Sequence, residues 1–272
     1  MTIRDRRLEW LRPAEIMEEM EQRPLVYLPL GPLEWHGPHL PLGTDALDAQ
    51  AVALRVAERV GGVVLPTFFC GSERERSSQQ LRDLGFKGDE WMVGMDFPKN
   101  TVKSLYFREE FLALHLREMV HLLSQQGYEL VIIINGHGAE NHIAVIERIS
   151  KEYTATGSVR VVPFLAWDAP GEPLDVGHAG AIETSRMMAL DPEAVDLSTL
   201  PPPEEPLYNV EWGIVDSLSF RGQPTPDFTT RNDPRTGTSP ERGEETLEIS
   251  VSHIAEQVTG ILSDMGYSAL PR

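Results

Sequence analysis

Histidine and acidic side chains gather in three short, glycine-containing segments of this 272-residue chain. The segments run over residues 31–45 (GPLEWHGPHLPLGTD), 135–141 (NGHGAEN) and 175–185 (DVGHAGAIETS). Their candidate ligands are Glu34, His36, His39, Asp45, His137, Glu140, His178 and Glu183. Imidazole and carboxylate groups together suit a borderline divalent metal such as zinc, manganese or iron. The segments therefore predict a divalent-metal centre. Two ions per chain, bridged by one aspartate, would activate water and polarise a carbonyl oxygen.

The elements around these segments place them at one end of a sheet. Hydrophobic patterning predicts strands at 25–30, 62–66, 129–134 and 159–164, and helices at 13–21, 45–60, 107–126, 140–153, 180–190 and 239–265. Repeated strand–helix units with buried strands indicate an α/β fold, a three-layer αβα arrangement with a mostly parallel sheet and helices on both faces. Chemistry in such a sheet lies beyond the carboxyl ends of the strands. Pro29 is expected at an edge or at the end of its strand, because proline cannot donate to a ladder.

The sequence predicts a single domain over residues 1–272. Two stretches, 67–106 and 191–238, lack a regular pattern. Loops of that length are uncommon in compact domains and often form lids or subunit contacts, with irregular packing as the alternative.

Composition limits the classes of partner and the cellular compartment that we expect. Lys and Arg total 24 against 42 Asp and Glu, a net charge of −18. A surface this acidic repels phosphate groups. We therefore expect neither nucleic acid nor an anionic membrane as a partner. Cys70 is the only cysteine, which excludes an intrachain disulfide. We expect a cytoplasmic protein, because no apolar run approaches ~18 residues and the first residues lack a secretory-signal pattern.

The three segments resemble the motifs of the creatininase family. Residues 31–45 are similar to its signature G-x-x-E-x-H-G-x-H-L-P-x-x-T-D, 135–138 to its N-G-H-G element, and 178–185 to its H-A-G-x-x-E-T-S element. Residues 240–244 (PERGE) are also similar to the start of its last helix. The resemblance implies a three-layer αβα fold, a homo-oligomer, and a divalent-metal centre that hydrolyses C–N bonds in small molecules.

By motif position, the resemblance implies Glu34, His36, Asp45 and His137 as ligands, with Asp45 bridging. His178 would be the acid/base that handles the proton of the leaving group. The fifth ligand stays open, because the place two residues after the histidine, a glutamate in creatininase, is Ala139 here. Glu183 is favoured over Glu140, which begins a helix and would face solvent.

The substrate of creatininase itself is not expected here. A tryptophan that closes over that substrate is replaced by Leu174, with Trp167 as a candidate substitute, so the resemblance points to another member of the family. Ser78 and Asp175 are the candidate substrate-binding residues. The polar segment around Ser78 would hold substrate hydroxyls or a carboxylate, with a solvated loop or a subunit contact as the alternative.

Three functions follow as alternatives. The first is hydrolysis of a cyclic amide or formamide C–N bond by a metal-bound hydroxide. The second is ring-opening C–C hydrolysis of a cyclic polyol diketone, an oxidised inositol. The third is a non-catalytic metal-binding protein, suggested by the irregular 135–141 segment.

Overall fold

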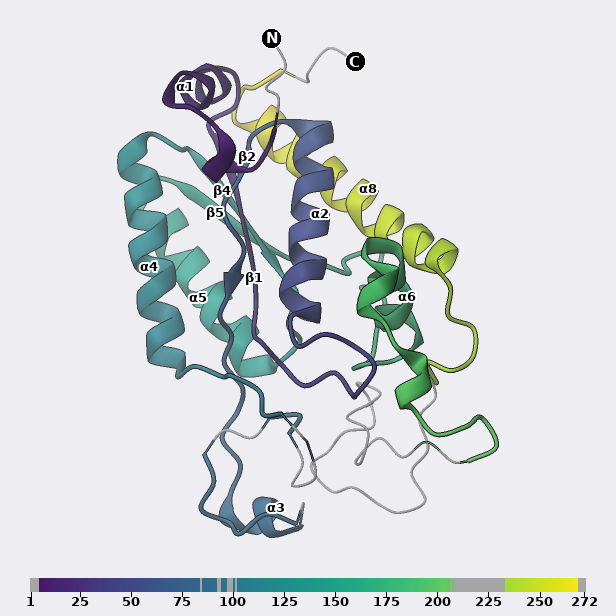
Figure 1. Ribbon diagram of the computed structural model, residues 1–272. Helices are drawn as coiled ribbons and strands as arrows, with labels where there is room; N and C mark the ends of the chain where they lie inside the picture. The colour runs from purple at the N-terminus through teal and green to yellow at the C-terminus, as the bar shows by residue number, and fades with distance from the viewer. Residues whose placement is uncertain are drawn as a thin grey trace.

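The chain forms a parallel β-sheet with helices on both faces, as seen in a computed structural model (Figure 1). The structure describes residues 5–83, 85–91, 94–96, 100, 102–205, 207 and 233–268. Much of the irregular stretch predicted at 191–238 therefore lies outside the described residues. Within the described ranges, no helix is both long and apolar enough to span a bilayer.

The sheet places the ends of its strands side by side. Its order is β2 (Val63–Val64), β1 (Leu25–Gly31), β4 (Leu130–Asn135) and β5 (Arg160–Leu165), and β3 (Phe68–Phe69) pairs with the end of β1. Every pairing between these strands is parallel, and Leu30 lies opposite Asn135. Segments 31–45 and 135–141 therefore leave the sheet at the same edge.

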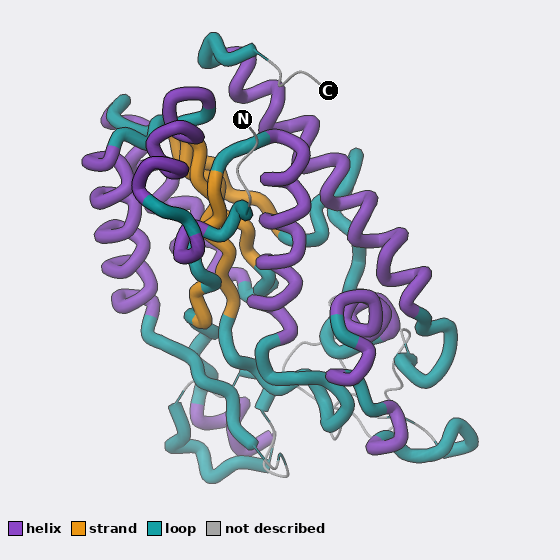
Figure 2. Tube along the Cα trace, turned by 45° about the horizontal axis from the view of Figure 1, so that its top comes forward, coloured by secondary structure: helices purple, strands orange, loops and turns teal. Residues whose placement is uncertain are grey.

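Helices cover the two faces of the sheet. On one face lie α2 (Thr44–Val60) and α8 (Pro240–Asp264), and on the other α4 (Glu109–Gln126) and α5 (Glu140–Thr156) (Figures 1 and 2). Strand residues alternate between the two cores: Leu25 and Tyr27 join the first, Val26 and Leu28 the second. The predicted three-layer αβα fold is confirmed.

The remaining elements are short or peripheral. They are the helices α1 (Pro13–Gln22), α3 (Ser78–Asp83) and α6 (Ala181–Leu190) and the 3₁₀ turns η1 (Leu8–Trp10), η2 (Pro192–Ala194) and η3 (Leu197–Thr199). The predicted helices agree with the structure to within a few residues. The strand expected at 62–66 is shorter, and β3 and α3 lie in the stretch 67–106, where no element was predicted.

The prediction for Pro29 is wrong, because this residue lies inside a central strand, opposite Ile134. Its missing N–H is tolerated for a local reason. The backbone carbonyl of Tyr27, two residues earlier, accepts a hydrogen bond from the Leu65 N–H on the β2 side at 2.9 Å. Because backbone groups two residues apart point to the same side of a strand, the backbone nitrogen of Pro29 also faces that side. At that point the neighbour of β1 changes from β2 to β3, and the ladder is interrupted there.

Two glycines bring the start of α2 against the strand ends. A Cβ at Gly136, just after β4, would lie 1.9 Å from the Asp45 carbonyl oxygen. A Cβ at Gly31, the last residue of β1, would lie 2.7 Å from Asp45 Cβ. Only glycine permits this approach, so the backbone itself holds Asp45 at the carboxyl edge of the sheet.

Candidate metal centre

Glu34 and His36 enter the site on the loop between β1 and α2. The loop is closed by a hydrogen bond from the Glu34 N–H to the Leu42 carbonyl at 2.8 Å. His36 Nδ1 lies 3.0 Å from the Glu34 carbonyl oxygen and donates to it, which turns Nε2 toward the interior of the site. Glu34 is 2% exposed and His36 is 0% exposed.

His137 is positioned by a polar brace after β4. The Asn135 side chain accepts from the His137 N–H at 2.9 Å and donates to the His137 carbonyl at 2.7 Å. His137 Nε2 donates to the Ser72 carbonyl at 3.2 Å, which leaves Nδ1 facing the site. His142 supports this arrangement: its Nε2 donates to Asn135 Oδ1 at 3.0 Å and its Nδ1 accepts from the Ser72 N–H at 3.2 Å.

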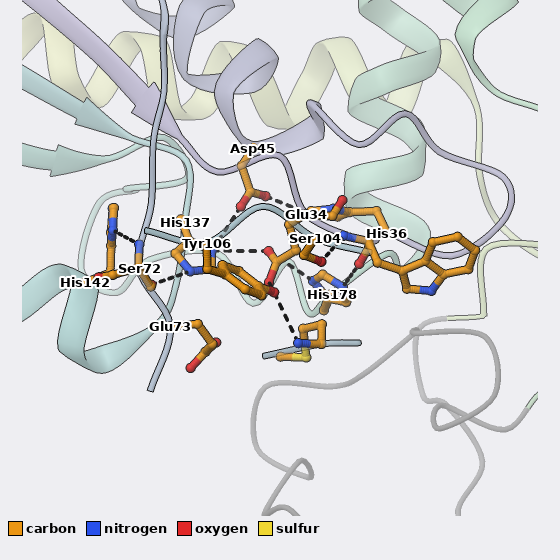
Figure 3. Close-up of polar contacts among 12 residues, drawn as sticks. Glu34, His36, Asp45, Ser72, Glu73, Ser104, Tyr106, His137, His142 and His178 are labelled. Carbon is orange, nitrogen blue, oxygen red and sulfur yellow. Dashed lines mark hydrogen bonds and ion pairs between the residues drawn. The ribbon is translucent and has the colours of Figure 1, made fainter. Parts of the chain in front are cut away.

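Asp45 lies between the two imidazoles (Figure 3). Its Oδ1 is 2.9 Å from His36 Nε2, and its Oδ2 is 3.0 Å from His137 Nδ1. Glu34 Oε2 lies 3.2 Å from the same His137 nitrogen. Each oxygen of Asp45 thus faces a different imidazole, which is the arrangement that a bridging carboxylate needs.

The third segment adds Glu183 and His178. Glu183, on the first turn of α6, places Oε2 3.8 Å from His36 Nε2 and accepts from the Ala179 N–H at 2.5 Å. Ala179 has a φ of 55°, so the backbone turns sharply between the two side chains. His178 Nε2 donates to the Trp35 carbonyl at 2.7 Å, and its Nδ1 faces Glu34 Oε2 at 4.0 Å.

The donor set has the chemistry to hold divalent metal. Ligand atoms within 4.8 Å of one another form the groups Glu34–Asp45–His137 and His36–Asp45–Glu183, which share Asp45. A further group joins Glu34, His36 and His178, and none of the groups found among the described residues contains the exposed Glu140. His36, His137 and His178 each donate a hydrogen bond from one ring nitrogen to a backbone carbonyl. The other ring nitrogen of each faces carboxylates. A ring nitrogen that faces a carboxylate must either carry a proton or share a metal ion with it.

The pKa shifts show how strongly the site attracts positive charge. Burial lowers the pKa of His36, but the neighbouring carboxylates, Asp45 foremost, outweigh it and raise the pKa to about 10. Burial also opposes the charged form of His137, yet Glu34 and Asp45 raise its pKa well above its usual value. His36 Nε2 is buried, and the polar groups found around it are the carboxylates of Asp45 at 2.9 Å and Glu183 at 3.8 Å. Metal ions would displace the protons that otherwise neutralise these carboxylates.

His178 behaves differently from the other two imidazoles. Burial lowers its pKa, and the positive charge on His36 lowers it further, to about 3. His178 is therefore neutral near pH 7 and keeps a lone pair on Nδ1. Metal bound at His36 would replace the proton that causes part of this shift.

A cavity of about 550 Å³ opens beside these side chains. Asp175, Leu174 and Trp167 lie in its wall. Ser78 is not brought to the cavity: it is exposed at the start of α3 and does not contribute to the described lining.

Two residues of the site, Tyr106 and Glu73, were missed in the sequence. The Tyr106 hydroxyl donates to Glu34 Oε1 at 2.5 Å and orients that carboxylate. Glu73 lies in the cavity wall and is 2% exposed, and burial raises its pKa. Both lie in the stretch 67–106, where no motif marks them.

A buried ion pair lies behind Asp45. Arg186 Nε is 2.9 Å from Asp48 Oδ1, and Arg186 Nη2 donates to the Ala166 carbonyl at 3.0 Å. We expect Arg186→Met to lower the free energy of unfolding by about 3–5 kcal/mol, because it leaves the Asp48 carboxylate buried without its partner. Denaturant unfolding of the metal-free protein measures this change.

The surface pair Arg117–Glu152 provides the control for this experiment. Its side chains are 37% and 48% exposed, so Arg117→Met should cost under about 1 kcal/mol. Equal losses for the two variants would contradict a structural role of the Arg186 ion pair.

Known proteins are similar to this chain in sequence and in fold. A family model described as creatinine amidohydrolase matches residues 9–258. The creatinine amidohydrolase of Pseudomonas putida is 29% identical over 255 residues, covering 86% of this chain and 88% of that protein. A mycofactocin precursor peptide peptidase of Mycobacterium ulcerans (strain Agy99) is 28% identical over 254 residues, covering 87% of each. A solved creatininase variant of Zn–Zn type superposes with a TM-score of 0.66 at 25% identity, covering 95% of this chain and 98% of that one.

Proposed function

Because the chain belongs to the creatininase family of metal-dependent hydrolases, we propose that it hydrolyses a C–N amide bond in a small polar molecule. The observation that carries this proposal is the position of Asp45. Its two oxygens face His36 and His137, each of which belongs to a separate group of three potential ligands. The ligands we propose are Glu34, His36, Asp45, His137 and Glu183.

Two divalent ions held there would supply an activated water and would polarise the carbonyl oxygen of the substrate. The chain provides the rest of the chemistry. Tyr106 fixes the orientation of Glu34, and the backbone carbonyls of Glu34, Ser72 and Trp35 fix the three imidazole rings. His178 Nδ1, at the edge of the cavity, would take a proton and deliver it to the leaving nitrogen.

Two of the relatives described above support hydrolysis of an amide bond. The names of both, an amidohydrolase and a peptide peptidase, describe cleavage of C–N bonds. Creatinine itself is a poor candidate for this chain, because Leu174 lies in the cavity wall at the position where the family's namesake has a tryptophan.

The reaction class is tested with the metal-loaded protein and a mixed panel analysed by mass spectrometry. The panel contains cyclic amides, formamides, a short peptide and an oxidised inositol, each incubated with zinc- and manganese-loaded protein. We expect turnover of at least one amide, and none by the Asp45→Asn variant. Ring-opening of the inositol diketone alone would contradict C–N hydrolysis and establish C–C hydrolysis instead.

We also propose that the protein is a cytoplasmic homo-oligomer. Large apolar side chains are exposed along α4 and just before it, at Phe107, Phe111, Leu114 and Leu122. Phe107 and Phe111 stack with ring centroids 4.8 Å apart. These exposed apolar side chains support a contact between subunits, because large exposed apolar patches mark interaction sites. Light scattering of the purified protein would measure the number of subunits.

A further inference from the structure

The cavity wall is acidic even without the proposed ligands. Glu34, Asp45 and Glu183 would be neutralised by the metal ions. Apart from the proposed ligands, four carboxylates line the cavity, and Arg74 is the only Lys or Arg among its described lining residues. The four acids are Glu73, Glu140, Glu172 and Asp175. The space in which a substrate must lie is therefore bounded by an excess of negative charge.

Glu73 is the most buried of these four acids. It is 2% exposed, whereas Glu140, Glu172 and Asp175 are exposed. Its carboxylate lies near His137 and Ser72 but apart from the network that joins Asp45, Glu34 and the histidines (Figure 3). Within the described chain, the hydrogen bond and the ion pair found for Glu73 both go to Arg74: Oε1 accepts from the Arg74 N–H at 2.7 Å and lies 3.5 Å from Arg74 Nε.

Arg74 neutralises Glu73 only weakly. The Arg74 side chain is 45% exposed, so solvent screens its charge, while the Glu73 side chain is withdrawn from water. Arg76 also acts on the charge of Glu73, but its Nη2 donates to the Gly94 carbonyl at 2.9 Å. A buried carboxylate whose contacting partner is solvent-screened is stabilised by a further cation that comes into contact with it. An anionic substrate would instead be repelled.

An aromatic ring in the same wall also suits a cation. Trp167 lines the cavity, and its indole ring lies 3.7 Å from where a Cβ on Gly138 would stand. The glycine leaves that part of the ring uncovered. Indole is the best aromatic partner for an organic ammonium group.

We propose that the substrate is a small amide that carries a protonated aliphatic amine, and that Glu73 selects it by pairing with the ammonium group. This inference rests on the proposed hydrolase function, which supplies the reacting end of the cavity. Glu73 is then a specificity-determining residue: it binds the part of the substrate that does not react.

Matched hydroxamates test the proposal without requiring turnover. A hydroxamate chelates divalent metal, so an alkyl hydroxamate reports the metal centre alone. Its ω-amino and ω-carboxylate analogues, in a series of increasing chain length, add a positive or a negative charge. Calorimetric titration of the metal-loaded protein should show the best amino compound binding roughly tenfold to hundredfold more tightly than its neutral analogue, the range of a hydrogen bond to a charged group.

Glu73→Gln should remove most of that preference and leave the affinity for the neutral hydroxamate unchanged. Glu75→Gln is the matched control, because Glu75 is exposed on the same loop and does not line the cavity. Equal affinity for amino and neutral compounds, or equal effects of the two variants, would overturn the proposal. Failure of every hydroxamate to bind would contradict the metal centre itself, and so the proposed function.

Discussion

The Asp45→Asn protein is expected to lose the ability to hold two metal ions and, with it, nearly all activity. An amide cannot bridge two cations as a carboxylate does, and Asp45 belongs to both groups of ligands that surround the proposed metals. We expect turnover to fall on the order of 10³-fold or more, since a metal pair supplies several kcal/mol of transition-state stabilisation. Metal content by elemental analysis and turnover of an amide from the panel would measure both effects.

Thermal stability separates a lost metal site from a lost fold. Wild-type protein should melt at a higher temperature when metal is added, because ligands that bind only the native state stabilise it. The Asp45→Asn protein should gain much less. Glu58→Gln removes the same charge from an exposed position of α2 and should respond like the wild type. Two tightly bound ions in the Asp45→Asn protein would show that Asp45 does not bridge them.

The sequence predicts the parts of this site that depend on local order. Glu34, His36 and Asp45 lie within a dozen residues, between a buried strand and a helix, and strand parallelism then brings His137 to the same edge. The close approach of Gly31 and Gly136 to Asp45 shows why glycines recur in these segments. The sequence already favoured Glu183 over Glu140, and the structure adds the distance: α6 brings Glu183 Oε2 to 3.8 Å from His36 Nε2.

Other features of the site could not be predicted from local patterns. Glu73 and Tyr106 come from a long stretch with little regular structure, and most glutamates in such a stretch are solvated. The sequence places Arg186 as a polar residue on an amphipathic helix. In the structure it is buried against Asp48, which is 138 residues earlier in the sequence. The prediction that Pro29 lies at an edge was wrong because β1 changes its neighbour from β2 to β3 near this residue. That change depends on the segment after β2, so it cannot be predicted from the residues of β1.

Replacement of His178 should slow the reaction without emptying the metal centre. His178 Nδ1 lies 4.0 Å from Glu34, and the five proposed ligands remain in place without it. We expect His178→Ala to lower turnover by about 10²–10⁴-fold, the usual contribution of a general acid or base, with metal content unchanged. His121→Ala, at an exposed position of α4, is the control and should retain full activity.

The leaving group distinguishes proton transfer by His178 from a structural role. An alkyl amine leaves only when an acid protonates it, whereas a nitroanilide, whose anion is far more stable, depends on that proton much less. The loss caused by His178→Ala should therefore be large for an alkyl amide and much smaller for a nitroanilide of the same acyl group. Loss of the hydrogen bond between His178 and the Trp35 carbonyl would disturb the loop of Glu34 and His36 and slow both substrates equally. Equal losses, or loss of metal, would thus remove His178 from the chemical step and assign it to positioning that loop.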